Sequence, residues 1–193
     1  MDGRMDGRPD GAPETEHREA RFLVVCTANI CRSPMGEALL RHRLKDVGVD
    51  AIVLSTGQLA AGVEVSRNSV VAMAERGLDI AGRRSVVTSA KHVAGADVIL
   101  TMGRSHVRKV IEVDLAAWPR TFPLRAAVRR ALHVGPRTHN ETLPECIPRE
   151  RRPAAPGKLL DRERHAIDQR LGVAETGGNG IAEHADGFAA AIR

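Results

Sequence analysis

The stretch FLVVCTANICRSPMGE, residues 22–37, decides how the rest of the chain is interpreted. It opens with five mostly apolar residues, 22–26, which predict a short buried β-strand. Ser33 and Pro34 then predict a helix start, because serine caps a first turn and proline suits the first helical position. In open parallel sheets ligands bind where strands end and helices begin. The turn between this strand and this helix is therefore the predicted site.

Strand-like and helix-like patterns alternate through the following hundred residues. Further strands are predicted at 51–55, 97–102 and 120–123. Further helices are predicted at 66–77, 88–94, 104–113 and 124–133. This alternation predicts an α/β fold, a doubly wound sheet of about four parallel strands with flanking helices and a Cys-x5-Arg phosphate loop after the first strand.

The chain of 193 residues fits one domain of ordinary size. Residues 1–20 repeat the tetrapeptide MDGR and are predicted to be a disordered tail. Residues 21–193 are predicted to form a single domain, with an irregular decorated loop at about 134–180 that is rich in proline, glycine and charge. A last helix is predicted at about 181–192.

Composition excludes several classes of function. Aromatic residues make up only 2% of the chain, and no basic run accompanies the net charge of +5, so we expect no nucleic-acid partner. Three cysteines, an odd number, and a charged first segment favour a reducing compartment, and we expect a cytoplasmic protein with no membrane partner. The histidines and cysteines lack metal-ligand spacing, so we expect no metal and no other cofactor.

The residues at the predicted turn suit a phosphate group. A loop between strand and helix can direct several backbone N–H groups inward, and the helix dipole adds positive potential. Arg32 offers a planar fork that matches two phosphate oxygens. In such surroundings Cys26 is expected to be a thiolate and a nucleophile, with Asn29 accepting a left-handed backbone and Ser33 donating to the sulfur. The alternative is a buried strand cysteine beside an unrelated arginine.

Residues 25–37, VCTANICRSPMGE, resemble the signature of the low-molecular-weight protein tyrosine phosphatases. The signature reads V-C-x-x-N-I-C-R-S-P followed closely by A-E, and Gly36 stands where alanine is usual. Three further segments are similar to the family: LSTG (54–57), ILTMGRSH (99–106) and FPLR (122–125). The resemblance covers about residues 21–133.

The resemblance implies a role for each residue of the loop. Cys26 would be the nucleophile that forms a phosphocysteine, and Arg32 would bind the phosphate and the transition state. Ser55 would support the loop by a hydrogen bond to Asn29. The phosphate would be bound by the loop residues Thr27, Ala28, Asn29, Ile30, Cys31, Arg32 and Ser33. The family also permits a protective disulfide between Cys26 and Cys31, whereas an inert buried thiol at Cys31 is the alternative.

The sequence departs from the family at the general acid. Family members carry an Asp-Pro dipeptide before the last helix, and this chain has no Asp-Pro. Glu175, just before the predicted helix 181–192, is the best substitute, ahead of Asp161 and Asp168 further upstream. The aromatic wall that members often place beside the substrate ring is also missing, and Leu59 is the only bulky apolar residue in the corresponding loop.

The leading hypothesis is a phosphatase that hydrolyses phosphotyrosine or aryl phosphate monoesters through a phosphocysteine intermediate. Its partner would be a phosphorylated protein or a small aryl phosphate. One alternative is a catalytically weak or inactive phosphate-binding regulator on the same fold. Another is an arsenate reductase, which the absence of relay cysteines from residues 99–115 disfavours.

Overall fold

The computed structural model describes residues 19–134, whose centre is a four-stranded parallel sheet in the order β2-β1-β3-β4. The strands are β1 (Ala20–Val25), β2 (Ala51–Thr56), β3 (Val98–Thr101) and β4 (Thr121–Pro123). This arrangement confirms the predicted fold class. Most of the predicted tail, nearly all of the segment 134–180, and the predicted helix 181–192 lie outside the described residues.

Three strands end at the same level. Val25, the last residue of β1, pairs with Thr56 of β2 and with Thr101 of β3. The chain leaves β1 toward β2, whereas β3 lies on the other side of β1. The loop after β1 therefore starts at the point where the strand order changes direction, which is where open sheets bind ligands.

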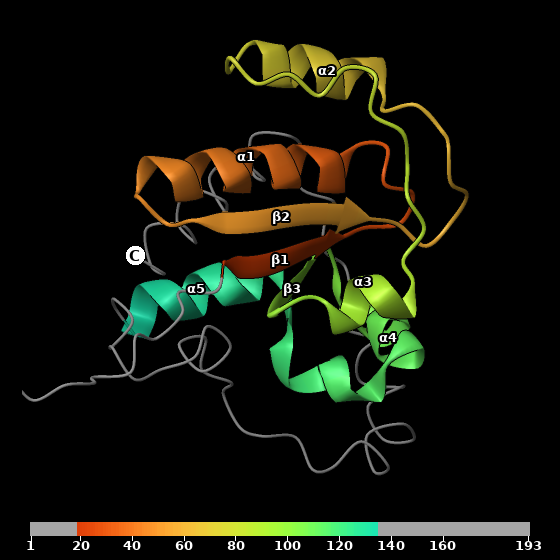
Figure 1. Cartoon of the computed structure of the whole chain (residues 1–193), viewed down its shortest axis with the longest axis vertical. Coiled ribbons are helices and arrows are strands. Elements are labelled where there is room, and N and C mark those ends of the chain that lie inside the picture. The colour runs from red at the N-terminus through yellow and green to blue at the C-terminus, as the bar shows by residue number, and fades with distance from the viewer. Residues whose placement is uncertain (1–18, 135–193) are drawn as a thin grey trace, which may run out of the picture.

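Helices cover both faces of the sheet (Figure 1). They are α1 (Arg32–Asp46), α2 (Arg67–Ala74), α3 (Ala90–Ala94), α4 (Arg104–Val113), the 3₁₀ helix η1 (Leu115–Arg120) and α5 (Leu124–Val134). In Figure 1, α1 lies between α2 and the sheet, while α3 and α4 lie on the opposite side. The first half of α1 is consequently enclosed by protein.

The core divides along the same layers. Alternate side chains of β1, such as Phe22 and Val24, pack with Leu40 and Leu44 of α1. The side chains between them, Leu23 and Val25, pack against the other helices, with Val93 of α3, Val110 of α4 and Ala117 of η1. A third cluster joins α1 to α2 through Met35, Leu39 and Met73. Buried alternation on both faces explains why β1 is a continuous apolar run.

Two predictions about the first strand and helix were wrong. β1 begins at Ala20, so the predicted tail of residues 1–20 overlaps the strand, and β1 ends at Val25, which places Cys26 in the loop. Ser33 does not cap α1, because the helix already begins at Arg32 and Ser33 lies inside its first turn. The serine hydroxyl is used by the loop instead. The helix η1 was not predicted.

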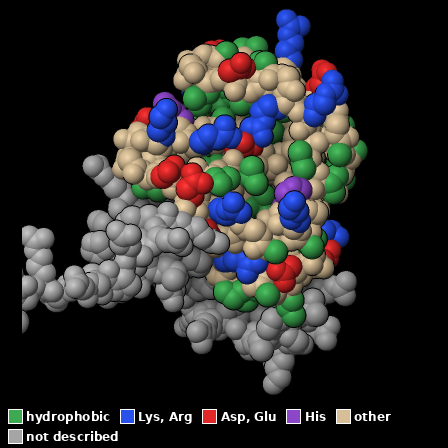
Figure 2. Space-filling model, viewed as in Figure 1, with side chains coloured by type: hydrophobic (Ala, Val, Ile, Leu, Met, Phe, Trp, Pro, Cys, Tyr) green, Lys and Arg blue, Asp and Glu red, His purple; other side chains and the backbone are tan. Residues whose placement is uncertain are grey.

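The surface of the described residues carries mixed charge. Figure 2 shows Lys and Arg side chains spread over the visible face, with acidic side chains among them. Such a surface is typical of solvated arginines and gives no single basic stripe on this face. Within residues 19–134, no helix is both long and apolar enough to cross a bilayer.

Candidate active site

The loop after β1 curls around the sulfur of Cys26. The Cys26 side chain is only 2% exposed, and the backbone N–H of Asn29 donates to its Sγ at 3.3 Å. Asn29 has a φ of 55°, the left-handed conformation predicted for it and one that asparagine adopts more readily than most residues. This backbone reversal turns the loop back toward Cys26 and directs an N–H group inward.

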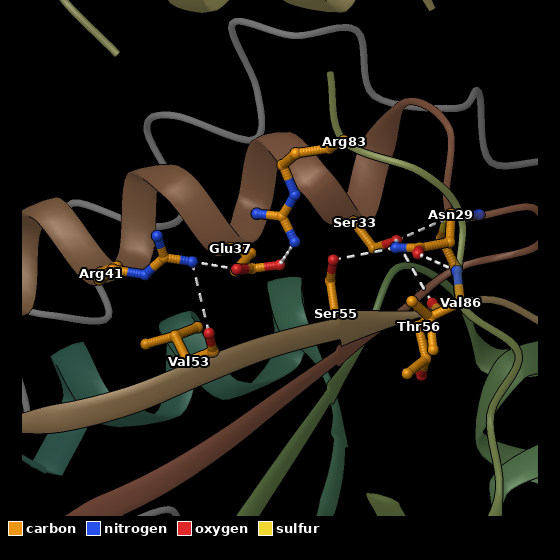
Figure 3. Close-up of polar contacts among 10 residues, drawn as sticks. Asn29, Ser33, Glu37, Arg41, Val53, Ser55, Thr56, Arg83 and Val86 are labelled. Atoms are coloured by element: carbon orange, nitrogen blue, oxygen red, sulfur yellow. Dashed lines mark hydrogen bonds and ion pairs between the residues drawn. The ribbon is translucent and has the colours of Figure 1, made fainter. Parts of the chain in front are cut away.

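The amide of Asn29 is buried and all of its polar atoms are used (Figure 3). Its Nδ2 donates to Ser33 Oγ at 2.8 Å and to Ser55 Oγ at 2.9 Å. Its Oδ1 accepts from the backbone N–H of Val86 at 2.8 Å. The hydrogen bond between Asn29 and Ser55 is the one that the family resemblance implied. Three separate segments therefore fix one side chain of the loop.

Ser33 Oγ lies 3.0 Å from Cys26 Sγ and connects the thiol to the rest of the loop. It accepts from Asn29 Nδ2 and also lies 3.3 Å from the carbonyl oxygen of Thr56. A hydroxyl has one proton to donate. With a protonated thiol, that proton goes to Thr56 and the S–H donates to Ser33. With a thiolate, the Ser33 proton turns to the sulfur and stabilises its charge.

Arg32 lies at the start of α1 with its guanidinium beside the loop. Its Nη2 donates to Thr27 Oγ1 at 3.1 Å, and the same hydroxyl lies 2.9 Å from Nε2 of His106. His106 comes from the first turn of α4, which follows β3, and its side chain is buried. The reversal of strand order thus brings a histidine from β3's exit to the loop that follows β1.

The start of α1 is open to an anion. Among the described residues, its N-cap, Cys31, makes no capping hydrogen bond through its side chain. The first N–H groups of a helix need partners, and an uncapped start attracts negative charge. Two carbonyl oxygens of the loop bond to residues outside it: Thr27 O accepts from Gln58 N at 2.7 Å, and Ile30 O accepts from Ser66 N at 2.7 Å. The loop can therefore present N–H donors to an oxyanion.

Gly57 supports the loop from β2 through a very close approach. A Cβ at this position would lie 2.7 Å from the carbonyl carbon of Ala28 and 2.7 Å from the N of Asn29. Both of those atoms belong to the backbone, so neither can swing aside. Only glycine lets the end of β2 pack this closely against the phosphate loop.

We expect Gly57→Ala to displace the loop by several tenths of an ångström or more. A misplacement near 1 Å costs about 10²-fold in kcat/KM, and such overpacking destabilises by about 1–3 kcal/mol. Steady-state kinetics and thermal unfolding measure the two effects. Gly62→Ala is the control, because the φ of 80° at Gly62 would strain an alanine backbone, but no atom lies within 4 Å of an added Cβ. Equal loss of activity in both variants would contradict the argument.

The sequence model of the family described as low molecular weight phosphotyrosine protein phosphatase matches residues 21–130, more than half of the chain. The chain belongs to this family. The match begins at the second residue of β1 and ends within α5, so it includes the four strands of the described residues, apart from Ala20, and the whole loop around Cys26.

The relatives of this chain carry more than one description. A Ralstonia solanacearum protein described as a "probable low molecular weight protein-tyrosine-phosphatase EpsP" is 42% identical over 88 residues, which are 46% of this chain and 59% of that protein. A Geobacillus stearothermophilus protein described as a protein-arginine-phosphatase is 37% identical over 109 residues, 56% of this chain and 71% of that protein.

Solved structures give the same fold. The crystal structure of a Bacillus subtilis YwlE mutant aligns with a TM-score of 0.62 at 19% identity, covering 89% of this chain and 97% of that one. The YwlE arginine phosphatase from Geobacillus stearothermophilus aligns with a TM-score of 0.58 at 26% identity, covering 88% and 90%. This chain therefore shares the fold of those structures. The sequence match to EpsP spans about three fifths of that relative's length.

The structure brings most of the predicted site residues together. Residues 27–31 form the loop around Cys26, Arg32 and Ser33 follow in the first turn of α1, and Ser55 supports the loop. Cys26 and Cys31 are both free thiols, and Cys31 is partly buried beside Met35 and its neighbours. Glu175, Asp161 and Asp168 lie outside the described residues, so the general acid stays a prediction.

Sequence reasoning missed three contributors to the site: Gly57, Val86 and His106. His106 contacts Thr27 of the loop from the first turn of α4, 79 residues further along the chain. Val86 acts through its backbone N–H, which carries no sequence signal. Gly57 did carry a sequence signal, because a glycine directly after a predicted strand often marks a close backbone approach.

Within residues 19–134, no cluster of His, Cys, Asp and Glu side chains is arranged to hold a metal ion.

Proposed function

We propose that the protein hydrolyses phosphate monoesters, with phosphotyrosine or another aryl phosphate as substrate, through a phosphocysteine on Cys26. The observation that carries the proposal is the geometry around the sulfur. Cys26 Sγ lies below a loop that has an inward N–H at Asn29, an uncapped helix start and the Arg32 guanidinium nearby. These are the parts that an in-line displacement at phosphorus needs.

In the first step the Cys26 thiolate attacks phosphorus as the bond from phosphorus to the aryl oxygen breaks. The phosphoryl oxygens carry the spread charge, and the N–H groups of the loop together with Arg32 stabilise it. The departing aryl oxygen takes the electron pair and then a proton. An acid would supply that proton, and Glu175 is the proposed one.

In the second step the Glu175 carboxylate, as the proposed base, takes a proton from water, whose oxygen attacks phosphorus as the bond from sulfur to phosphorus breaks. The electron pair returns to sulfur, and inorganic phosphate leaves. Ser33 Oγ, at 3.0 Å from Cys26 Sγ, is placed to donate its proton toward the developing thiolate. Asn29 Nδ2 holds Ser33 Oγ in that position at 2.8 Å.

Two exposed apolar residues near the loop favour an aromatic substrate. Leu59 is 60% exposed and follows Gln58, whose backbone N–H donates to Thr27 O of the loop. Val86 is also exposed, and its backbone N–H donates to Asn29 Oδ1. An aromatic ring gains from contact with such groups, whereas the cationic guanidinium of phosphoarginine loses hydration there. Phosphoarginine enters the substrate panel because one relative is described as a protein-arginine-phosphatase.

Turnover by the purified full-length protein tests the proposal. We expect p-nitrophenyl phosphate and a phosphotyrosine peptide to be hydrolysed faster than phosphoarginine. Rapid denaturation during turnover should trap a phosphoryl group on a peptide that contains Cys26, which mass spectrometry would locate. Hydrolysis without any trapped adduct on Cys26 would contradict the phosphocysteine mechanism.

A series of esters with different leaving groups tests Glu175, the proposed substitute for the aspartate of the family's Asp-Pro dipeptide. The segment around Glu175 also lacks the proline of that dipeptide. Glu175→Gln should slow esters with poor leaving groups by about tenfold or more, because those need protonation, and barely affect nitrophenyl esters. Asp168→Asn is the control. Equal rates for the parent and Glu175→Gln across the whole series would remove Glu175 from the mechanism.

The absence of Asp-Pro favours a second candidate, a phosphate-binding regulator with little turnover. Such a regulator would bind phosphate, as the enzyme would, but it would not hydrolyse aryl phosphates at a measurable rate. Phosphate binding by a full-length protein that shows no hydrolysis of nitrophenyl phosphate above a Cys26→Ala control would favour this candidate over the enzyme.

A further inference from the structure

Glu37 is a buried carboxylate that no step of the proposed mechanism uses. Its side chain is 3% exposed, and it lies one helical turn after Ser33 on α1. A charge this deep is costly unless it is paired. Two arginines share it, Arg41 through Oε1 and Arg83 through Oε2 (Figure 3).

The two ion pairs connect different parts of the chain. Arg41 belongs to α1 itself, four residues after Glu37, and its Nη2 also donates to the carbonyl oxygen of Val53 at 3.5 Å. Arg83 comes from the segment between α2 and α3, 46 residues away in sequence. In Figure 3 the side chain of Arg83 extends toward Glu37 from a segment that passes beside α1. Of these two ion pairs, the one with Arg83 joins α1 to the segment 83–86.

That segment continues to the phosphate loop. Three residues after Arg83, the N–H of Val86 donates to Asn29 Oδ1 at 2.8 Å. The carbonyl oxygen of Val86 accepts from Gly57 N at 2.8 Å. Val86 therefore contacts both the loop and the glycine that packs against it.

The Asn29 amide is thus held from two sides. Ser33, on α1, binds its nitrogen, and Val86, on the segment 83–86, binds its oxygen. Both contacts persist only while α1 and the segment keep their relative position. The pair between Glu37 and Arg83 joins α1 to the segment one helical turn from Ser33 and three residues from Val86.

We propose that Arg83 is a positioning residue for the phosphate loop, with Glu37 as its anchor and the Val86 N–H and Asn29 as the path of its effect. Its influence on turnover rests on the proposed function, whereas its influence on the order of the loop does not. Backbone hydrogen bonds to residues 57–65 still hold the segment when the pair is lost, but its direct ion pair to α1 is gone. The contact of Val86 with Asn29 then weakens, and the left-handed conformation of Asn29 is held less firmly.

Arg41 provides a matched control. Arg83→Met and Arg41→Met each remove one arginine from the same carboxylate and leave it one partner, so both variants keep Glu37 paired. Amide hydrogen exchange of the peptide that contains residues 27–32 is the readout, measured on the full chain without ligand. We expect exchange to rise about tenfold in Arg83→Met and less than about twofold in Arg41→Met.

Arg83→Lys should restore part of the protection, because an ammonium on a flexible stem can still reach Glu37. If Arg83→Met loses its cooperative thermal transition, Arg83→Gln against Arg41→Gln decides in the same way, because glutamine also removes the charge. Equal exchange within either matched pair would overturn the proposal.

Kinetics on the same variants separate this inference from the proposed function. With an active parent, kcat for nitrophenyl phosphate should fall about tenfold in Arg83→Met and stay near the parental value in Arg41→Met. Equal kcat values in the two would overturn the positioning role. A parent that does not hydrolyse aryl phosphates, while the contrast in exchange persists, would remove the proposed function and leave the role of Arg83 standing.

Discussion

Cys26→Ser is expected to abolish hydrolysis of aryl phosphates and to leave phosphate binding in place. Removal of a nucleophile of this kind costs about 10⁴-fold or more in kcat. A serine hydroxyl at this position is a weak nucleophile without a base, but it can still accept from Asn29 N and bond to Ser33 Oγ. Calorimetric titration with inorganic phosphate and kinetics with nitrophenyl phosphate measure the two properties.

Cys26→Ala separates the chemistry from the shape of the loop. It removes the partner of Asn29 N and Ser33 Oγ as well as the nucleophile, so phosphate binding should weaken in this variant and not in Cys26→Ser. Turnover by Cys26→Ser within tenfold of the parent would eliminate the covalent mechanism. Loss of phosphate binding in Cys26→Ser would show that the sulfur itself is needed to hold the loop.

Arg32→Lys is expected to be nearly as damaging, although it preserves the charge. The guanidinium is planar and can donate to two phosphate oxygens at once, whereas an ammonium acts as a point charge. Loss of one such transition-state donor costs about 10²–10³-fold in kcat. Phosphate affinity should fall by a smaller factor, because the N–H groups of the loop remain.

Arg84→Lys is the matched control for that substitution. Arg84 pairs with Glu64 at 2.7 Å, and both side chains are exposed, so its effect on kcat should be within about twofold. Similar kinetics for Arg32→Lys and Arg84→Lys would mean that Arg32 contributes only general positive potential. In that case raising the ionic strength should reduce the rate of the parent steeply.

The local part of the site was predictable from the sequence. The strand, the turn with Cys26 and Arg32, and the helix follow one another within residues 20–46, so apolar runs and residue types place them. Asn29 in a left-handed conformation followed from its residue type. The boundaries of β1 and α1 were misplaced by one or two residues, because backbone hydrogen bonds and not side chains set them.

The distant supports of the site were not predictable in the same way. Val86 and His106 reach the loop from segments more than 50 residues further along, and their approach depends on how α3 and α4 pack on the sheet. Glu37 was part of the quoted motif, yet its pairing with Arg83 depends on a segment without regular structure. Only Ser55 was foreseen, because the family resemblance supplied that contact.

The first turn of α1 has no side-chain cap at Cys31, so a bound anion would stabilise the helix. A bound oxyanion would bond N–H groups that the Cys31 side chain leaves without a cap, so it would take the place of an N-cap residue. Occupancy and folding are then linked, and saturating phosphate at about 100 times its Kd would add about 2.7 kcal/mol to the free energy of unfolding. The melting temperature of the protein would report how much phosphate its surroundings contain.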